Sequence, residues 1–236
     1  MKKVSEVMTE LKKLGTAQNV KIYSRHGAPE NMFGVSVANM KKVAKKIKGN
    51  HELALELYDT GNADAMYLAG MVADGSQMNK TQLNKWAKNS AWYMVGEYAV
   101  PGVATESKHA HDLALKWIKA KKDHIASCGW CTYVGLMATR DDSELDQKEI
   151  KALLKQIEKE VDGAGNRTRY TMNGFVIAVG TYVKPLLKQA KATAKKIGKV
   201  DVQMGETSCK VPLATEYIAK VEKMGRVGKK RKTMKC

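Results

Sequence analysis

The sequence lacks the signals of a membrane-spanning or secreted protein. No window of its 236 residues approaches 18 consecutive apolar residues, the length that a membrane-spanning helix needs. The first 15 residues, MKKVSEVMTELKKLG, are amphipathic and have no apolar core of a signal peptide. We therefore expect a cytoplasmic protein with no membrane partner. Its four cysteines are then expected to be reduced rather than joined in disulfides.

The common sequence motifs of nucleotide-driven and hydrolytic enzymes are also missing. No glycine-rich loop of the Walker or dinucleotide type follows a predicted strand, and neither G-x-S-x-G nor H-E-x-x-H occurs. These absences argue against those two classes of enzyme. We expect no nucleotide and no other cofactor.

Acidic residues are scarce relative to basic ones. The chain has 41 Lys and Arg against 24 Asp and Glu, a formal net charge of +17, and a pI near 9.6. A charge of this size predicts attraction to a polyanion, with nucleic acid first and anionic membrane second. Residues 220–236 hold eight basic residues and one acid, including the run Lys229, Lys230, Arg231 and Lys232. We expect residues 225–236 to form a basic tail that is disordered until it meets a partner.

Strand patterns are scarce, and apolar residues recur with helical spacing almost throughout. Asparagine or serine residues suited to N-caps precede several of these segments, and glycines follow them. Residues 101–102, Pro-Gly, are expected to stop one helix, and Thr105 to start the next. The predicted helices cover residues 4–14, 37–47, 51–60, 63–74, a segment that Asn79 opens and that contains Leu83 and Trp86, the aromatic segment that follows it up to Pro101, and residues 105–118, 123–139, 150–161, 166–182, 185–197 and 213–224.

A dozen short amphipathic helices joined by short turns favour an all-α fold. We predict a HEAT-like α-solenoid of stacked antiparallel helix pairs, with residues 1–224 as a single domain. A compact orthogonal bundle is the alternative. Residues 199–213 differ because Val200 and Val202 alternate with polar residues, so a small hairpin near 199–211 or an extended loop is expected there.

Aromatic side chains are few, yet Trp86, Trp92, Tyr93 and Tyr98 fall within residues 86–102. Glu97 is the only acid in that stretch. Rings beside a lone carboxylate suit a pocket for a flat, electron-poor or cationic group. A helix that packs its rings into a core, with Glu97 in solvent, is the alternative.

Cys128 and Cys131 form a C-x-x-C motif, and His124 precedes it by four residues, on one face of a predicted helix. A fourth ligand, from Cys209, Cys236 or the His109-x-His111 pair, has no recognisable zinc spacing. We favour buried cysteines that act as small apolar residues, and we predict no metal site.

Residues 166–170 open a helix and contain Arg167 and Arg169. Free amides at a helix start beside two arginines suit a phosphate, and solvated first-turn charges are the alternative. The run at 229–232 is a stronger electrostatic signal, and it suits RNA, DNA or an anionic membrane equally.

The order of these features resembles the bacterial DNA alkylation repair family, the alkylpurine DNA glycosylases built from HEAT-like helix pairs. The resemblance spans about residues 4–198. It includes HELALELYDTGNADAMYLAGMVAD at 51–74 and NKWAKNSAWYMVGEYAV at 84–100. It implies a concave, basic face that grips the DNA backbone. It also implies, in catalytic members, aromatic rings and a carboxylate that stabilise positive charge on the sugar.

The family signature is incomplete in this chain. Aligning Asn89-Ser90 with the family's asparagine-serine pair places Gly96 at the catalytic aspartate and Glu97 one residue later. On a regular helix this shift turns a side chain by about 100°, so a local bulge is required for Glu97 to replace the aspartate. The family's tryptophan before an arginine pair falls near Trp130, which no arginine follows.

Three functions remain open. The first, which we favour, is a nucleoid-associated protein that binds duplex or distorted DNA and has lost or altered the glycosylase site. In this hypothesis Arg167, Arg169, Lys229, Lys230, Arg231 and Lys232 contact the DNA phosphates. The second is an active glycosylase for cationic alkylated purines, with Glu97 as its carboxylate and Trp92, Tyr93 and Trp130 as pocket walls. The third is a protein-interaction scaffold, which the net charge disfavours unless its partner is acidic.

Overall fold

A computed structural model describes residues 1–235. These residues form thirteen α-helices, and no strand occurs among them. None of the helices is both long and apolar enough to cross a bilayer. The helices are α1 (Val4–Leu14), α2 (Ala17–Arg25), α3 (Val37–Lys46), α4 (His51–Asp59), α5 (Ala63–Val72), α6 (Lys80–Asn89), α7 (Val100–Ala104), α8 (Ala110–Ile118), α9 (Asp123–Thr139), α10 (Gln147–Glu160), α11 (Asn166–Tyr182), α12 (Leu187–Ile197) and α13 (Ala214–Lys223).

The predicted caps explain where several helices begin. Ser36, Asn50, Asn62 and Asn79 each accept a hydrogen bond from a backbone N–H in the first turn of the helix that follows. Asn79 also forms a capping box with Gln82. These side chains satisfy amides that have no partner within the helix, which confirms the predicted starts of α3, α4, α5 and α6.

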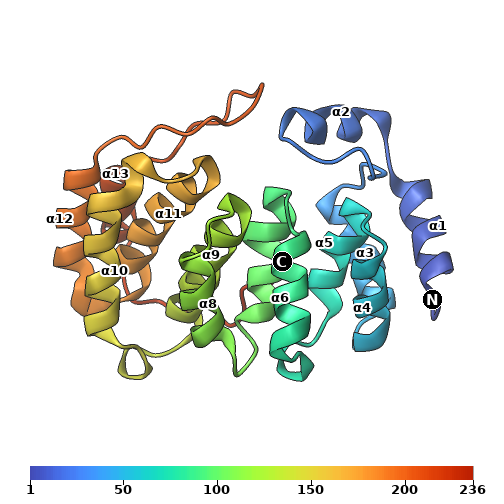
Figure 1. Ribbon diagram of the computed structural model, residues 1–236, viewed down its shortest axis with the longest axis horizontal. Helices are drawn as coiled ribbons and strands as arrows, with labels where there is room; N and C mark the ends of the chain where they lie inside the picture. Colours follow the sequence, from blue (N-terminus) through green and yellow to red (C-terminus); the bar gives the residue numbers. More distant parts are fainter. Residues whose placement is uncertain (236) are drawn as a thin grey trace.

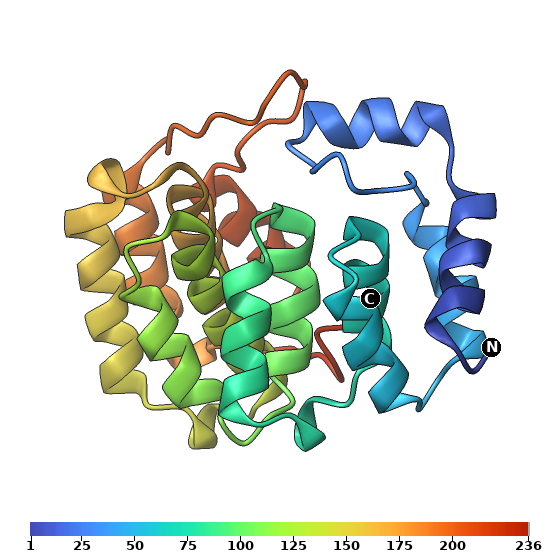
Figure 2. The ribbon, with the colours of Figure 1, turned by 45° about the vertical axis from the view of Figure 1, so that its right-hand side comes forward.

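The helices form a curved array of two rows, as the resemblance implied (Figures 1 and 2). The inner row consists of α5, the π-helical segment η2 (Met94–Ala99) with α7, α9 and α11, and each member packs against the next. The helices α4, α6, α8 and α10 form the outer row. Inner helices are buried on most sides, whereas α6, α8 and α10 keep a charged outer face.

Two hydrophobic clusters meet in the middle of the array. One covers α1 to α7 and includes Leu113, Trp117 and Cys128, and the other covers the helices up to α13 and includes Ala114 and Trp130. Helices α8 and α9 therefore contribute to both. The array accordingly has continuous packing from α1 to α13.

Two predicted helix boundaries and one loop differ from expectation. Pro101 and Gly102 do not stop a helix, because Pro101 lies in the first turn of α7, where a missing N–H is tolerated. The next helix starts at Ala110 rather than Thr105. Helix α2 was not predicted, although Thr16 caps it by accepting from the Asn19 N–H.

Residues 199–213 form an extended loop and not a hairpin. The Gln203 backbone pairs with the Asn166 side chain through two hydrogen bonds of 2.7 and 2.9 Å, so it is not available to an opposite arm of the loop. The loop reaches the end of α2, where Gly205 lies against the Arg25 carbonyl (Figures 1 and 2). A Cβ at position 205 would lie 2.3 Å from that oxygen, and the φ of +76° also favours glycine.

Two glycines inside inner-row helices give a stability test of the packing. At Gly129 of α9, a Cβ would lie 2.5 Å from the Ile118 nitrogen of α8, whereas at Gly174 of α11 it would meet no atom within 4 Å. We expect Gly129→Ala to lower the free energy of unfolding by about 1–3 kcal/mol through overpacking. Gly174→Ala should raise it by about 1 kcal/mol through helix propensity. Urea denaturation measures both changes in the free energy of unfolding. Equal effects of the two substitutions would contradict the close approach of α9 to α8 at Gly129.

Candidate functional site

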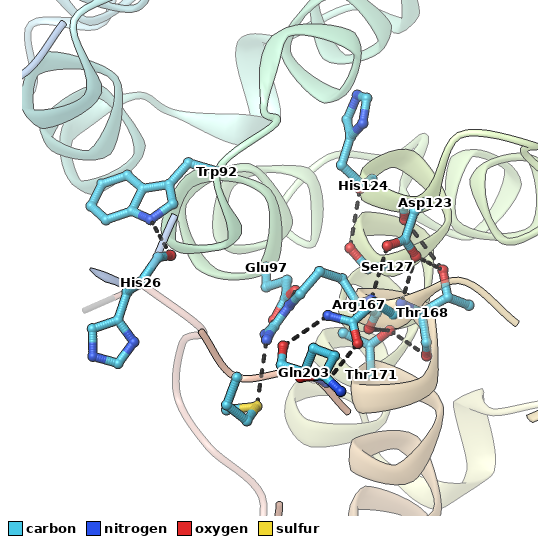
Figure 3. Close-up of polar contacts among 12 residues, drawn as sticks. His26, Trp92, Glu97, Asp123, His124, Ser127, Arg167, Thr168, Thr171 and Gln203 are labelled. Atoms are coloured by element: carbon cyan, nitrogen blue, oxygen red, sulfur yellow. Dashed lines mark hydrogen bonds and ion pairs between the residues drawn. The ribbon is translucent and has the colours of Figure 1, made fainter. Parts of the chain in front are cut away.

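An aromatic cleft of about 500 Å³ opens between the two ends of the array. The end of α2, the segment before and within η2, the first turn of α11 and the 199–213 loop all contribute to its wall. Figure 3 shows its floor. The lining residues are His26, Gly27, Ala91, Trp92, Tyr93, Tyr98, Asn166, Arg167, Tyr170, Gln203, Met204, Gly205, Cys209 and Lys210.

An ion pair between Glu97 and Arg167 lies at the floor of this cleft (Figure 3). Arg167 Nε donates to Glu97 Oε1 at 2.7 Å, and Arg167 Nη2 donates to Glu97 Oε2 at 2.6 Å. The Glu97 side chain is 3% exposed and that of Arg167 is 21% exposed. Both carboxylate oxygens are therefore occupied by one guanidinium in bidentate geometry.

Burial sets the electrostatics of this pair. Desolvation raises the pKa of the Glu97 carboxyl above its usual value, and the hydrogen bonds and charge of Arg167 oppose that shift. Desolvation alone would lower the pKa of Arg167, but Glu97 outweighs it and raises that pKa. Glu97 thus has a dedicated counter-cation within the chain.

The guanidinium of Arg167 also contacts two aromatic rings. Its central carbon lies 4.9 Å from the centroid of the Tyr93 ring and 4.5 Å from that of Tyr170. Both distances are within the range of cation–π attraction. The guanidinium of Arg167, itself a flat cation, therefore lies against the rings that were predicted to hold a flat or cationic ligand.

The π-helical geometry of η2 explains why Glu97 faces inward. A π-helix accommodates an extra residue per turn, which is the local bulge that the one-residue displacement of Glu97 required. Gly96 is needed beside it, because a Cβ there would lie 2.7 Å from the Ser90 carbonyl oxygen. The backbone shift turns Glu97 into the cleft floor instead of toward solvent.

The start of α11 is capped by the chain itself and does not form the open phosphate site considered above. Asp123 Oδ2 accepts from the Arg167 N–H at 2.9 Å, and Oδ1 accepts from the Thr168 N–H at 2.8 Å (Figure 3). A carboxylate at a helix N-terminus is favoured by the helix dipole. It leaves those two amides unavailable to a phosphate.

A second depression, which we call the basic groove, lies beside the cleft and has a volume of about 1020 Å³. Inner-row helices form its floor, and α13 and the basic tail form its far wall. Tyr98 lines both spaces, so they are adjacent. The lining residues of the basic groove are Tyr98, Val134, Gly174, Ile177, Ala178, Thr181, Tyr182, Tyr217, Lys220, Val221, Met224, Arg226, Lys229, Lys230 and Arg231.

The basic tail is attached to the array, contrary to the expected disorder. Gly228 N–H donates to the Thr181 carbonyl, and Arg231 N–H donates to the Ala138 carbonyl. Lys235 Nζ donates to the Ala73 carbonyl and pairs with Glu106. The tail therefore runs across the carboxyl ends of α11, α9 and α5, where exposed carbonyls and the helix dipole favour cations.

The predicted DNA-contacting cations fall into two groups. Arg167 is paired with Glu97, and Lys230 donates to Asp142 and to the Met137 carbonyl with 17% of its side chain exposed. These two are structural in the free protein. Lys229, Arg231 and Lys232 are exposed and make no ion pair with the described residues, whereas Arg169 is only partly exposed. Their contact with DNA remains a prediction.

The predicted ring walls are only partly brought together. Trp92 and Tyr93 line the cleft, and Trp92 Nε1 donates to the His26 carbonyl at 3.3 Å. Trp130 does not reach it, because it is fully buried and packs 5.0 Å from the Phe175 ring. Sequence reasoning missed Tyr170, whose spacing of three residues from Arg167 places both on one helix face.

The cysteines and histidines do not converge. Cys128 is buried in the core, and burial raises the pKa of the Cys128 and Cys131 thiols, which disfavours the thiolates that a metal requires. His124 Nε2 lies 3.1 Å from the Lys88 carbonyl. Among residues 1–235, no group of three His, Cys, Asp or Glu side chains is placed to hold a metal ion, and Cys236 lies outside the described residues.

The fold and the groove define a basic helical-repeat protein with an aromatic cleft between the ends of its array. Residues 7–202 match the family model described as DNA alkylation repair enzyme. The chain belongs to the DNA alkylation repair family.

Three relatives extend this result. A solved structure with a TM-score of 0.90 and 38% identity, covering 98% of both chains, is described as a new family of proteins related to the HEAT-like repeat DNA glycosylases with affinity for branched DNA structures. An uncharacterised protein of Listeria innocua is 34% identical over 90% of this chain and 94% of its own length. One of Listeria monocytogenes is 32% identical over the same shares.

The ion pair between Glu97 and Arg167 predicts how the free energy of unfolding changes when Arg167 is replaced, and how that change depends on pH. Arg167→Met should lower the free energy of unfolding by about 3–5 kcal/mol at neutral pH, because Glu97 stays buried without its cation. The pKa of Glu97 rises further in this variant. Since its folded pKa then exceeds its unfolded pKa, stability is retained at low pH and is lost as the pH rises through the folded value. Urea denaturation at pH 5 and pH 8 measures this.

The double variant Glu97→Gln/Arg167→Met is the matched control, because it leaves neither charge of the pair at the cleft floor. It should recover much of the loss and remove the pH dependence. Lys46→Met breaks an exposed pair with Glu10 and should cost at most about 1 kcal/mol. If Arg167→Met is no more destabilising than Lys46→Met, the buried pair is not formed in solution.

Proposed function

We propose that this protein binds duplex and branched DNA, mainly through phosphate contacts made by the basic groove. The observation that carries the proposal is the set of unpaired cations along this groove. Lys220, Arg226, Lys229 and Arg231 line it, and none of them makes an ion pair with the described residues. Among residues 1–235, no acidic side chain lines the groove. Such a surface attracts a polyanion.

The distribution of acids supports this proposal. On the outer row, Lys80 pairs with Asp112 and Lys85 pairs with Asp59. Lys196 of α12 likewise pairs with Glu158 of α10. These lysines have acidic partners, whereas Lys220, Arg226, Lys229 and Arg231 at the groove have none among the described residues. We treat residues 1–224 as the DNA-binding domain and residues 225–236 as a tail that contributes cations to it.

Affinity for branched DNA structures is attributed to the solved relative, which covers 98% of both chains. An extended overlap at 38% identity supports a related ligand for this chain. A DNA ligand would place the protein at the nucleoid, within the cytoplasm. Which branch geometry it binds would depend on how the groove and cleft meet at Tyr98.

We also propose that glycosylase activity is lost or altered, because Arg167 occupies the cleft floor. A charge-stabilising carboxylate must face the positive charge that develops on the substrate. Glu97 instead faces the guanidinium of Arg167 with both oxygens. The active glycosylase, with Glu97 as the carboxylate between rings, remains the alternative that an assay must test.

Salt dependence tests the binding proposal. Fluorescence anisotropy with a labelled duplex and a three-way junction should show affinity that falls steeply with salt and varies little with sequence. Arg226→Ala/Arg231→Ala should reduce the slope of log K against log salt by about 2, since each phosphate contact contributes about 0.9.

The control is Lys80→Ala/Lys85→Ala on the outer row, which removes the same charge and should leave the slope unchanged. Undetectable binding to both DNA forms at low salt would overturn the proposal. A protein-interaction scaffold would behave in that way.

An assay of base release tests the proposal that glycosylase activity is lost or altered. Duplex DNA carrying N7-methylguanine should release no free base when incubated with excess protein, and chromatography of the supernatant measures this. Release that disappears in Glu97→Gln would contradict the proposal and identify an active enzyme. A glycosylase of the family with known alkylbase activity serves as the positive control for the substrate.

A further inference from the structure

The basic groove carries exposed aromatic rings that phosphate binding does not explain. Tyr98 and Tyr217 are each 49% exposed, and they are two of the four large apolar side chains that the described residues leave exposed. Tyr182 also lines the groove and is partly exposed. The rings come from η2, α11 and α13, so the fold gathers residues from distant parts of the chain around one space.

The floor between these rings is made of small side chains. Gly174, Ala178 and Thr181 lie along one face of α11, at positions separated by three and four residues. A Cβ at Gly174 would meet no atom within 4 Å, so the packing of the core does not require glycine there. This floor lets a flat group approach the helix closely.

The cations lie on the far wall of the groove, and hydrogen bonds of the tail to the array hold that wall in place. Gly228 and Arg231 attach the tail through their backbone N–H groups, and Lys230 attaches it through its side chain. The side chains of Lys229 and Arg231 line the groove and make no ion pair within the part of the chain that the structure describes. Lys220 and Arg226 continue the same wall. The groove thus combines exposed rings with unpaired cations, and α13 contributes both Tyr217 and Lys220.

Aromatic rings beside a cationic track are the two components of sites for single-stranded nucleic acid. Bases of an intact duplex are stacked on each other and cannot cover a protein ring. Unpaired bases can stack on tyrosines while their phosphates contact the cations. A volume of about 1020 Å³ is at the upper limit of small-ligand pockets and suits a segment of polymer.

We infer that the basic groove binds an unpaired DNA strand, with bases against Tyr98 and Tyr217 and phosphates against the tail. This inference rests on the proposed function and specifies which part of a branched DNA the groove takes. Tyr98 also borders the aromatic cleft, so the strand enters the groove beside the Glu97–Arg167 pair. The duplex arms then contact the remaining basic surface.

Competition between strand types tests the inference. Anisotropy is measured with a labelled oligo-dT, a blunt duplex of equal length, and the same duplex carrying a single-stranded oligo-dT arm. The armed duplex should bind more tightly than the blunt one. Tyr217→Ala should weaken binding of oligo-dT and of the armed duplex by ~10-fold, the equivalent of one stacked base. It should change blunt-duplex binding by less than twofold.

Two further variants separate stacking from folding. Tyr217→Phe retains the ring and should bind like the wild type. Gly174→Leu fills the groove from a position with open space above it, and should weaken oligo-dT binding without lowering the stability. Ile22→Ala removes an exposed apolar side chain of α2, outside the groove, and should have no effect.

The outcomes are distinguishable from failure of the proposed function. If no DNA form binds, the proposed function itself is wrong. If the blunt duplex binds and Tyr217→Ala weakens all three DNA forms equally, the protein binds DNA but the groove holds no unpaired strand. Tighter binding of oligo-U than of oligo-dT would overturn the assignment of the strand as DNA.

Discussion

The buried ion pair between Glu97 and Arg167 is the interaction on which the arrangement of the site depends. It joins the π-helical segment η2 to the first turn of α11, over a sequence separation of 70 residues. Its formation requires two local irregularities. The π-helix must turn Glu97 inward, and Asp123 must hold the start of α11 by accepting from the Arg167 and Thr168 amides. Because an unpaired buried carboxylate is costly, these features are expected to form together or not at all.

This pair also relates the protein to the chemistry of its family. Rings beside a carboxylate suit a cation, and Arg167 supplies one from within the chain, between the rings of Tyr93 and Tyr170. Because Arg167 balances the charge of the Glu97 carboxylate, the cleft needs no cationic substrate for that purpose. Beyond Tyr98, four of the cations that line the basic groove make no ion pair with the described residues. The aromatic cleft contains the rings and the acid that stand out in the sequence. The basic groove carries unpaired cations. The two sites are neighbours that share Tyr98, but they are separate.

The basic tail shows how composition can mislead about order. Eight basic residues in the last 17 predict a solvated, disordered segment, since like charges repel. In the structure the carboxyl ends of α11, α9 and α5 present carbonyl groups that accept from Gly228, Arg231 and Lys235. These acceptors come from helices about 50 to 160 residues away in the chain. No pattern within residues 225–236 could have indicated them.

The sequence by itself determined most of the helices and their order, although not α2, because caps and apolar periodicity are local. The predicted ranges 123–139 and 166–182 coincide with α9 and α11, and the asparagine caps fix where α4, α5 and α6 begin. The family followed from the same order of segments. The tertiary structure alone decided that Glu97 faces Arg167, that Trp130 packs in the core, and that Tyr217 joins Tyr98 in one groove. Helical periodicity specifies which face of a helix is apolar, whereas the partner of a buried charge is set by the packing of segments that are distant in sequence.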